Sequence, residues 1–310
     1  MNANIIYTTA WKHERTTELV ISAVLQGFRA IESGCQPRNY REDLVGEALQ
    51  TLYNDHGFKR RDLFLQSKYV QFNSQDSTLP LPYNPSDPLR VQVTASFYAS
   101  LSFLRTSYLD AFILHQKLPT YSQTLEAWKA LVKLQDLGKV RAIGMRNVYR
   151  VGLLERLGKE SGRPVQIVQD RWRSRNNWDS NILDWCRKNG AQFQGSQSIA
   201  GSRRLLSSPV LKKIASNKNR RPTQVLYRFA QSQGVTPLSG CTTDQHMQED
   251  LEAEGIELDE GEIDSLVKQV EHLTISRRKA VYRRDHTSHG YPETTSEAEG
   301  ESSTLLPSVD

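Results

Sequence analysis

The chain alternates short apolar segments with helical segments about eight times, and this alternation restricts its possible folds more than any other feature. An apolar run at 4–8 precedes an amphipathic stretch that ends at Gly27, and a second run at 28–32 leads to an amphipathic stretch at 42–55. Six further strand-like runs follow at 62–68, 108–115, 139–145, 165–169, 191–195 and 235–240. This alternation is typical of a parallel β-sheet. Eight units in roughly 270 residues favour a closed (β/α)8 TIM barrel.

An open, doubly wound sheet is the alternative interpretation of the same pattern. It is less favoured because no G-x-G-x-x-G motif follows the first predicted strand. We expect the barrel to occupy residues 1–275 and a polar tail to occupy residues 276–310. The tail has few apolar residues and no periodicity, which is typical of disorder. A basic address or partner-binding segment is the second interpretation of this tail.

Composition excludes several classes of function. The net charge is +5, but the 40 basic and 35 acidic residues are interspersed, so we expect no nucleic-acid partner. Cys35, Cys186 and Cys241 are far apart and odd in number, which favours neither a disulfide framework nor a metal site. They suit a reducing, cytoplasmic setting. No apolar run approaches the roughly 20 residues that span a bilayer, and the first residues do not form a secretory signal.

Three polar residues end successive predicted strands, and a fourth follows in a loop. Glu32 ends the second strand, Lys68 the third and His115 the fourth, while Tyr40 lies in the loop after Glu32. In a (β/α)8 barrel the carboxyl ends of the strands meet at one rim. We therefore expect these four side chains to converge, although each one alone also has an ordinary structural explanation.

The four residue types together suit proton transfer to a carbonyl group. A tyrosine has an ordinary pKa near ~10, and a neighbouring ammonium lowers it. A carboxylate paired with the lysine holds the ammonium in place, and a neutral histidine can donate a hydrogen bond to a carbonyl oxygen. Such a site protonates a C=O group while another group supplies hydride.

Several stretches resemble the aldo-keto reductase family in sequence and in order. They include "GFRAIESGCQPRNYREDLVGEAL", "RRDLFLQSKY", "YLDAFILHQKLP", "EAWKALVKLQDLGKVRAIGMRNV" and "TPLSGCTTDQHMQEDL". The resemblance covers about residues 4–275. It implies a (β/α)8 barrel and NADPH-dependent reduction of an aldehyde or ketone. It assigns Tyr40 as the proton donor, Lys68 as its pKa partner and His115 as the residue that orients the carbonyl, with Glu32 in place of the family's aspartate.

The resemblance also implies positions that contact the cofactor. They are Arg146, Asn147, Gln169, Ser196, Thr242, Thr243 and His246. Arg146 replaces a serine that helps to bind the nicotinamide amide, and Ser196 replaces an aromatic residue that stacks on the nicotinamide ring. Hydroxyls and a histidine replace the Lys-Ser and Arg that usually hold the 2′-phosphate. We expect NADP as the cofactor, with NAD as the alternative, and no metal.

The beginning of the chain departs from the family pattern. The family usually starts with a β-hairpin that closes the bottom of the barrel, and we expect this cap to be missing. Thr8 takes the place of a glycine at the end of the first strand. The favoured function is reduction of a small-molecule carbonyl substrate with NAD(P)H. The alternative is a degenerate barrel that binds a ligand or performs a cofactor-independent step.

The sequence does not identify the substrate or the oligomeric state. Tyr69, Phe72, Tyr83 and Trp172 either line an apolar pocket or are packing residues. Arg203 and Arg204 either contact the pyrophosphate or are solvated. A monomer is favoured by analogy with the family alone.

Overall fold

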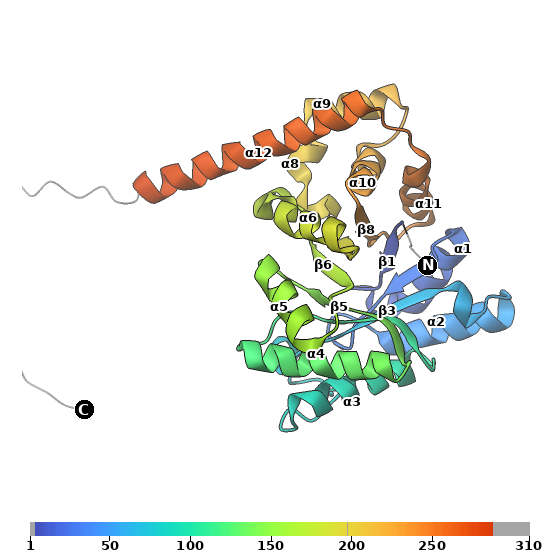
Figure 1. The fold of residues 1–310 in the computed structure, drawn as a ribbon. Helices are drawn as coiled ribbons and strands as arrows, with labels where there is room; N and C mark the ends of the chain where they lie inside the picture. Colours follow the sequence, from blue (N-terminus) through green and yellow to red (C-terminus); the bar gives the residue numbers. More distant parts are fainter. Residues whose placement is uncertain (1–3, 197, 288–310) are drawn as a thin grey trace, which may run out of the picture.

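Eight parallel strands form a closed barrel in the computed structural model, which describes residues 4–196 and 198–287 (Figure 1). Each strand pairs with its sequence neighbour, and the last strand pairs with the first. The strands are β1 (Ile6–Thr8), β2 (Ala30–Glu32), β3 (Phe64–Tyr69), β4 (Leu109–Leu114), β5 (Val140–Arg146), β6 (Ile167–Arg171), β7 (Gln192–Ser196) and β8 (Val235–Ser239). The predicted TIM barrel is confirmed, and the open sheet is wrong.

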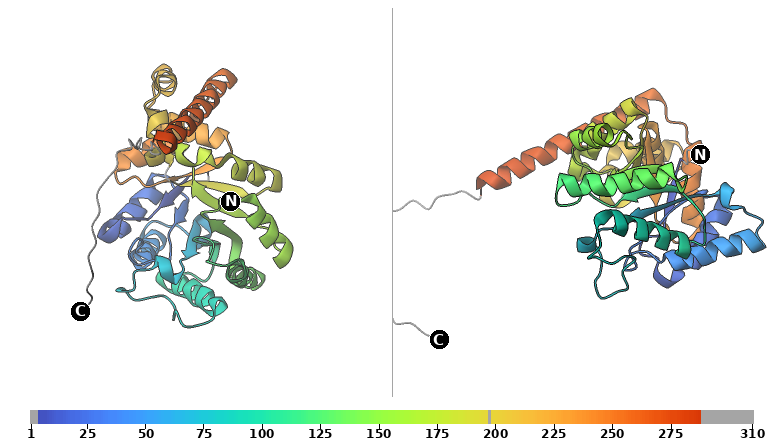
Figure 2. Two further views of the ribbon diagram at one scale, coloured as in Figure 1. Left: turned by 90° about the vertical axis from the view of Figure 1, so that its left-hand side faces the viewer. Right: turned by 60° about the horizontal axis from the view of Figure 1, so that its bottom comes forward.

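Helices surround the barrel in every view (Figures 1 and 2). The α-helices are α1 (Thr16–Gln26), α2 (Glu42–Asp55), α3 (Leu89–Phe103), α4 (Tyr121–Asp136), α5 (Val151–Ser161), α6 (Ser180–Asn189), α7 (Ser198–Gly201), α8 (Arg203–Leu206), α9 (Pro209–Asn217), α10 (Pro222–Ser232), α11 (Asp244–Glu252) and α12 (Glu260–Thr287). Short 3-10 helices lie at His13–Arg15, Arg60–Asp62, Phe72–Ser74, Ser174–Asp179 and Ala253–Gly255. The inner faces of the helices and the outer faces of the strands share one apolar core.

The barrel interior is apolar at its lower end and polar above it. Ile6, Ala30 and Leu238 form a small buried cluster with Phe64. Nearer the rim, Gln66 on β3 and Gln194 on β7 are each less than 2% exposed and exchange two hydrogen bonds of 2.8 Å across the barrel. Because both amides donate and accept, this pair satisfies groups that would be costly to bury alone.

Four helical segments differ from the sequence prediction, and two of them are the short helices α7 and α8, which were not predicted. α5 was not predicted, although it ends in the ordinary way at Gly162, which has a left-handed φ of 69°. α12 continues to Thr287 and so enters the segment predicted to be a disordered tail from residue 276. Its Arg, Lys and Ala residues favour helix. The remainder of the predicted tail, residues 288–310, lies outside the described residues.

The two ends of the described chain differ in their contacts with the barrel. Only Asn4 and Ile5 precede β1 in the described chain, so no hairpin is present there. α12 begins against α8, α9 and α10, where Leu266 is fully buried, and then extends well beyond the barrel (Figures 1 and 2). No helix among the described residues has the length and apolar character needed to cross a membrane.

A close approach of two helices requires glycine at position 46. A Cβ added to Gly46 on α2 would lie 2.0 Å from the Phe103 carbonyl oxygen at the end of α3. We expect Gly46→Ala to lower the free energy of unfolding by about 1–3 kcal/mol or more, because the helices must separate. Urea unfolding followed by circular dichroism measures this effect.

Gly158→Ala is the matched control for that substitution. Gly158 also lies within a helix, but its added Cβ would make only an ordinary 3.5 Å contact with Pro164. Alanine there should leave stability unchanged or raise it by up to about 1 kcal/mol. Equal destabilisation by both substitutions would contradict the helix-contact argument.

Candidate active site

A cavity of about 910 Å³ opens at the carboxyl ends of the strands. Its wall includes Glu32, Tyr40 and His115, three of the four residues that the sequence predicts to converge. The fourth, Lys68, is fully buried directly behind them. The topology produces this convergence because β2, β3 and β4 are adjacent and parallel, so that their final residues reach the same rim.

Lys68 joins the tyrosine and the glutamate. Its Nζ donates a hydrogen bond of 2.9 Å to Tyr40 Oη and forms an ion pair with Glu32, whose side chain is 1% exposed. Thr8 Oγ1 donates to the other Glu32 oxygen at 2.5 Å. A Cβ on Gly34 would lie 2.9 Å from Lys68 Cγ, so glycine at this position leaves room for the lysine stem.

Burial controls the protonation of this group. It lowers the pKa of Lys68 well below its usual range, and the Arg146 guanidinium lowers it further. The ion pair with Glu32 opposes this effect and favours the charged ammonium. Burial also raises the pKa of Tyr40, while Arg146 acts in the opposite direction. The net shift is upward, which is opposite to the lowering expected from a neighbouring lysine in the sequence analysis. The phenol is therefore protonated at neutral pH and can serve as a proton donor.

His115 is held neutral and in one tautomer. Burial, followed by the charges of Arg146, Lys68 and Arg171, lowers its pKa to about 3. Arg146 Nη1 lies 3.4 Å from His115 Nδ1. A guanidinium only donates, so Nδ1 accepts this hydrogen bond and Nε2 carries the proton. The imidazole can then donate its Nε2–H to an oxygen in the cavity.

The seven residues predicted to contact the cofactor do not all reach the cavity. Arg146, Ser196 and His246 line it. Asn147 lines a neighbouring pocket with Tyr149, and its Nδ2 donates to the His115 carbonyl at 3.1 Å.

Gln169, Thr242 and Thr243 lie elsewhere. Gln169 is fully buried, and its Nε2 donates to Gln194 at 3.0 Å. Thr242 and Thr243 are exposed before α11, where Thr243 Oγ1 accepts the His246 backbone N–H as the N-cap. Three of the seven residues predicted to contact the cofactor therefore line the cavity, and the other four do not.

Three basic residues of the cavity wall were not identified as site residues from the sequence. Lys12, Arg171 and Arg221 line the cavity. Lys12 Nζ donates to the carbonyl oxygens of Gly240 and Cys241, which ties the loop after β1 to the loop after β8. Arg171 ends β6, and this strand-end position is a signal that would have identified it. Arg221 precedes Pro222 in a loop and gave no comparable signal.

The four aromatic residues that were expected either to line a pocket or to pack do not line this cavity. Tyr69 and Tyr83 are buried against each other, with ring centroids 5.4 Å apart. Trp172 is 2% exposed and packs on Trp178 and Phe229. Among the described residues these aromatic side chains are packing residues, while Phe72 is 43% exposed on a 3-10 helix.

A buried carboxyl group, Glu42, lies behind the site. Ser67 and Ser100 donate to its two oxygens at 2.6 and 2.9 Å, and burial raises its pKa from 4.5 to about 7. Between pH 4.5 and about pH 7, the Glu42 carboxyl is therefore protonated in the folded state and ionised in the unfolded state. The stability that this proton provides is complete below pH 4.5 and is lost as the pH rises through about 7.

We expect Glu42→Gln to remove this pH dependence. Between pH 4.5 and pH 8, the native chain should lose about 2–3 kcal/mol of unfolding free energy that the variant does not lose, so the variant gains in relative stability at high pH. Urea unfolding at several pH values measures it. Glu47→Gln, which removes an exposed carboxylate of the same helix, is the control. Parallel profiles for the native chain and Glu42→Gln would contradict the assignment.

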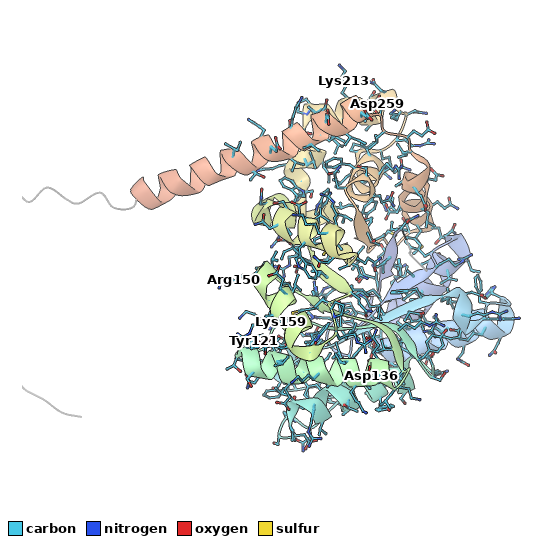
Figure 3. All side chains as sticks on the ribbon, in the orientation of Figure 1. Tyr121, Asp136, Arg150, Lys159, Lys213 and Asp259 are labelled. Carbon is cyan, nitrogen blue, oxygen red and sulfur yellow. The ribbon has the colours of Figure 1, made fainter. Side chains whose placement is uncertain are left out.

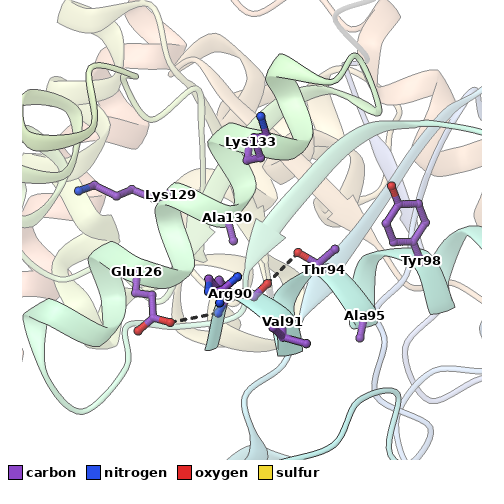
Figure 4. A pocket seen from close by; sticks show the side chains of 9 residues that line it. All are labelled: Arg90, Val91, Thr94, Ala95, Tyr98, Glu126, Lys129, Ala130 and Lys133. Carbon is purple, nitrogen blue, oxygen red and sulfur yellow. Dashed lines mark hydrogen bonds between the residues drawn. The ribbon is translucent and has the colours of Figure 1, made fainter. Parts of the chain in front are cut away.

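A second hollow lies outside the barrel, between α3 and α4 (Figure 4). Its volume is about 650 Å³, and it is bordered by Arg90, Tyr98, Glu126, Lys129 and Lys133. The Arg90 backbone N–H donates to Glu126 at 3.2 Å and links the two helices. The residues that line it include no histidine or cysteine, and it lies away from the strand ends. We assign it no chemistry.

A (β/α)8 barrel with tyrosine, lysine, histidine and a carboxylate at its mouth defines a class of carbonyl-reducing barrel proteins. Residues 7–271 match the model of the aldo/keto reductase family, and the chain belongs to this family. It is 27% identical over 251 residues to the glyoxal reductase of Bacillus subtilis, covering 81% of this chain and 82% of the relative. It is 29% identical over 254 residues to an NAD/NADP-dependent indole-3-acetaldehyde reductase of Schizosaccharomyces pombe, covering 80% and 81%.

Solved structures agree on the fold. An aldo/keto reductase from Brucella melitensis superposes with a TM-score of 0.71 at 24% identity, covering 86% of this chain and 94% of the other. An aldo-keto reductase complexed with NADPH superposes with a TM-score of 0.72 at 19% identity, covering 86% and 83%. At these identities the similarity establishes the barrel alone.

Proposed function

We propose that this chain reduces a small aldehyde or ketone to an alcohol with NAD(P)H and that Tyr40 is the proton donor. The observation that carries the proposal is the 2.9 Å contact of Tyr40 Oη with Lys68 Nζ at the wall of the 910 Å³ cavity, next to a neutral His115. The relatives named above reduce aldehydes according to their names. Membership of the family supports an oxidoreductase.

Each of the four residues has a part in the proposed reaction. Tyr40 and His115 donate hydrogen bonds to the carbonyl oxygen, and this polarises the C=O group. The Tyr40 proton moves to the oxygen, and the Lys68 ammonium stabilises the phenolate that remains. Glu32 keeps Lys68 charged and in place. When bound, the nicotinamide supplies the hydride, and proton donation of this kind contributes roughly 10²–10⁴-fold to rate.

The described residues fit a nicotinamide cofactor, with one departure. Gln169 Oε1 is buried and has no hydrogen-bond partner among the described residues. Because Gln169 lies behind the cavity wall, it can accept from a carboxamide only if that group enters behind the wall, and Asn147 at the neighbouring pocket is the second candidate for this group. Thr243 and His246 stand at the N-terminus of α11, where phosphate groups bind well. The departure is Ser196, which offers no aromatic surface for stacking. We propose NADP, with NAD as the alternative.

A second candidate function is a step without hydride transfer. The observations that favour it are Ser196 in place of an aromatic residue and the Arg146 guanidinium next to His115. In this case the barrel binds a carbonyl compound but does not hold the nicotinamide in reach of it.

Titration with NADPH separates the two functions. Cofactor binding quenches tryptophan fluorescence, and NADPH oxidation at 340 nm reports turnover of glyoxal or methylglyoxal. Saturable quenching with NADPH consumption supports the reductase. The absence of quenching at millimolar NADPH would overturn it and leave the cofactor-independent step.

A further inference from the structure

The strongest feature that the proposed reaction does not use is Arg146. It ends β5 and lines the cavity beside His115 and Tyr40. Among the described residues its guanidinium makes a single hydrogen bond, the 3.4 Å contact with His115 Nδ1. Its Nε–H is buried and has no partner. A guanidinium has five N–H donors, so most of its donor capacity is unused.

No carboxylate of the described chain neutralises this charge. Glu32 lies in the same cavity wall, but it pairs with Lys68 and accepts from Thr8. Asp170 is buried, accepts the Val148 backbone N–H at 3.0 and 3.1 Å, and interacts electrostatically with Arg146. Burial raises the pKa of Asp170 to about 8, so this carboxyl is mostly protonated at neutral pH and does not offset the guanidinium charge. A partly buried guanidinium without a counter-charge is costly. The arrangement therefore favours a ligand that brings its own negative charge.

The rest of the cavity wall supports a ligand of this charge. Lys12 lies in the wall without a carboxylate partner among the described ion pairs and donates to carbonyl oxygens instead. Arg221 is neutralised by Glu249 at 2.5 Å. Asp250 is the third acid of the wall and accepts from Ser239 at 2.6 Å. The wall has four basic residues, Lys12, Arg146, Arg171 and Arg221, against three acids, so its net charge is positive.

The position of Arg146 limits where that negative charge must lie. In the proposed reaction the carbonyl oxygen accepts hydrogen bonds from Tyr40 Oη and His115 Nε2. Arg146 lines the same cavity wall as these two residues and contacts His115 through one Nη, which leaves its other Nη donors for a group bound beside the carbonyl. Arginine binds carboxylates with two parallel hydrogen bonds. We propose that the substrate is a 2-oxo carboxylate, with its carboxylate on Arg146 and its reactive carbonyl on Tyr40 and His115. This proposal rests on the proposed function.

The reaction is then reduction of a 2-oxo carboxylate to a 2-hydroxy carboxylate. The carbonyl π bond breaks, a C–H bond forms with hydride from NAD(P)H, which is oxidised to NAD(P)⁺, and an O–H bond forms with the Tyr40 proton. Solvent returns a proton to Tyr40. The carboxylate takes no part in bond changes and keeps its charge.

Binding of an unreactive analogue tests the inference without turnover. Oxamate is a charged analogue of a 2-oxo acid, and oxamide is its neutral counterpart. Calorimetry on the full chain, with and without NADP⁺, should show tighter binding of oxamate. We expect Arg146→Ser to weaken oxamate about ten- to a hundredfold and to leave oxamide nearly unchanged. Arg146→Lys should recover part of the affinity, because it restores charge without the planar fork.

Arg150→Ser is the matched control for long-range charge. Arg150 is exposed at the start of α5, outside the cavity (Figure 3), so its removal should leave oxamate affinity unchanged. Equal affinity of the native chain for oxamate and oxamide, or equal weakening of both by Arg146→Ser, would overturn the inference. Thermal unfolding of each variant establishes that it is folded.

Turnover distinguishes this inference from the proposed function. With NADPH, Arg146→Ser should lower kcat/KM for glyoxylate about ten- to a hundredfold more than kcat/KM for glyoxal. Equal effects on the two substrates overturn the carboxylate assignment while the reductase stands. Reduction of neither substrate, together with Arg146-dependent oxamate binding, overturns the reductase and supports Arg146 as the carboxylate contact.

Discussion

Tyr40→Phe is expected to lower kcat/KM for carbonyl reduction by about 10²–10⁴-fold. Phenylalanine keeps the ring that packs over Lys68 but removes the only proton that the proposed reaction transfers to the carbonyl oxygen. Cofactor affinity should change little, because Tyr40 is not among the groups that we assign to the cofactor. Initial rates with glyoxal and fluorescence titration with NADPH measure the two quantities separately.

Tyr53→Phe is the matched control for this substitution. Tyr53 lies on α2, and its hydroxyl is buried without a hydrogen-bond partner, so its loss should alter neither rate nor cofactor affinity. Native turnover by the Tyr40→Phe variant would refute Tyr40 as the proton donor. A large loss of cofactor affinity in that variant would show instead that the tyrosine shapes the cofactor site.

Glu32→Gln is expected to lower the free energy of unfolding by about 3–5 kcal/mol. The change leaves the Lys68 ammonium fully buried without a counter-charge, or forces it to lose its proton. Urea unfolding at pH 7 measures the loss. Glu160→Gln, which breaks the exposed ion pair with Arg156, should produce no measurable change.

The double variant Glu32→Gln/Lys68→Met separates charge from packing. Removing both charges should recover much of the stability that either single change loses, because no uncompensated ion remains. Activity should stay low in all three variants, since each removes support for the Tyr40 phenolate. Additive losses of stability in the double variant would mean that the pair contributes through packing rather than through charge.

The sequence predicted the barrel well because the strand signal is local. Most strands contain a short apolar run bounded by turn residues, and the parallel order follows from the alternation itself. α5 was missed because its two buried residues, Leu154 and Leu157, give a short apolar stripe among charged residues. The end of the helical region was misplaced because α12 continues through a polar segment without apolar periodicity.

The site was only partly predictable for a different reason. Strand position determines which residues reach the rim, so the convergence of Glu32, Lys68 and His115 followed from topology. Side-chain direction and hydrogen-bond partners depend on the packed structure. The sequence therefore could not show that Arg146 turns toward His115 or that Gln169 is covered and joined to Gln194.

The amide pair between Gln66 and Gln194 has a consequence for the position of Lys68. The pair joins β3 to β7 across the barrel, directly below the mouth. Lys68 lies two residues after Gln66 on the same face of β3. Movement of β3 away from β7 would break both bonds at once and leave two buried amides without these hydrogen bonds. The pair therefore keeps β3, and with it Lys68, in a fixed position below the open mouth of the cavity.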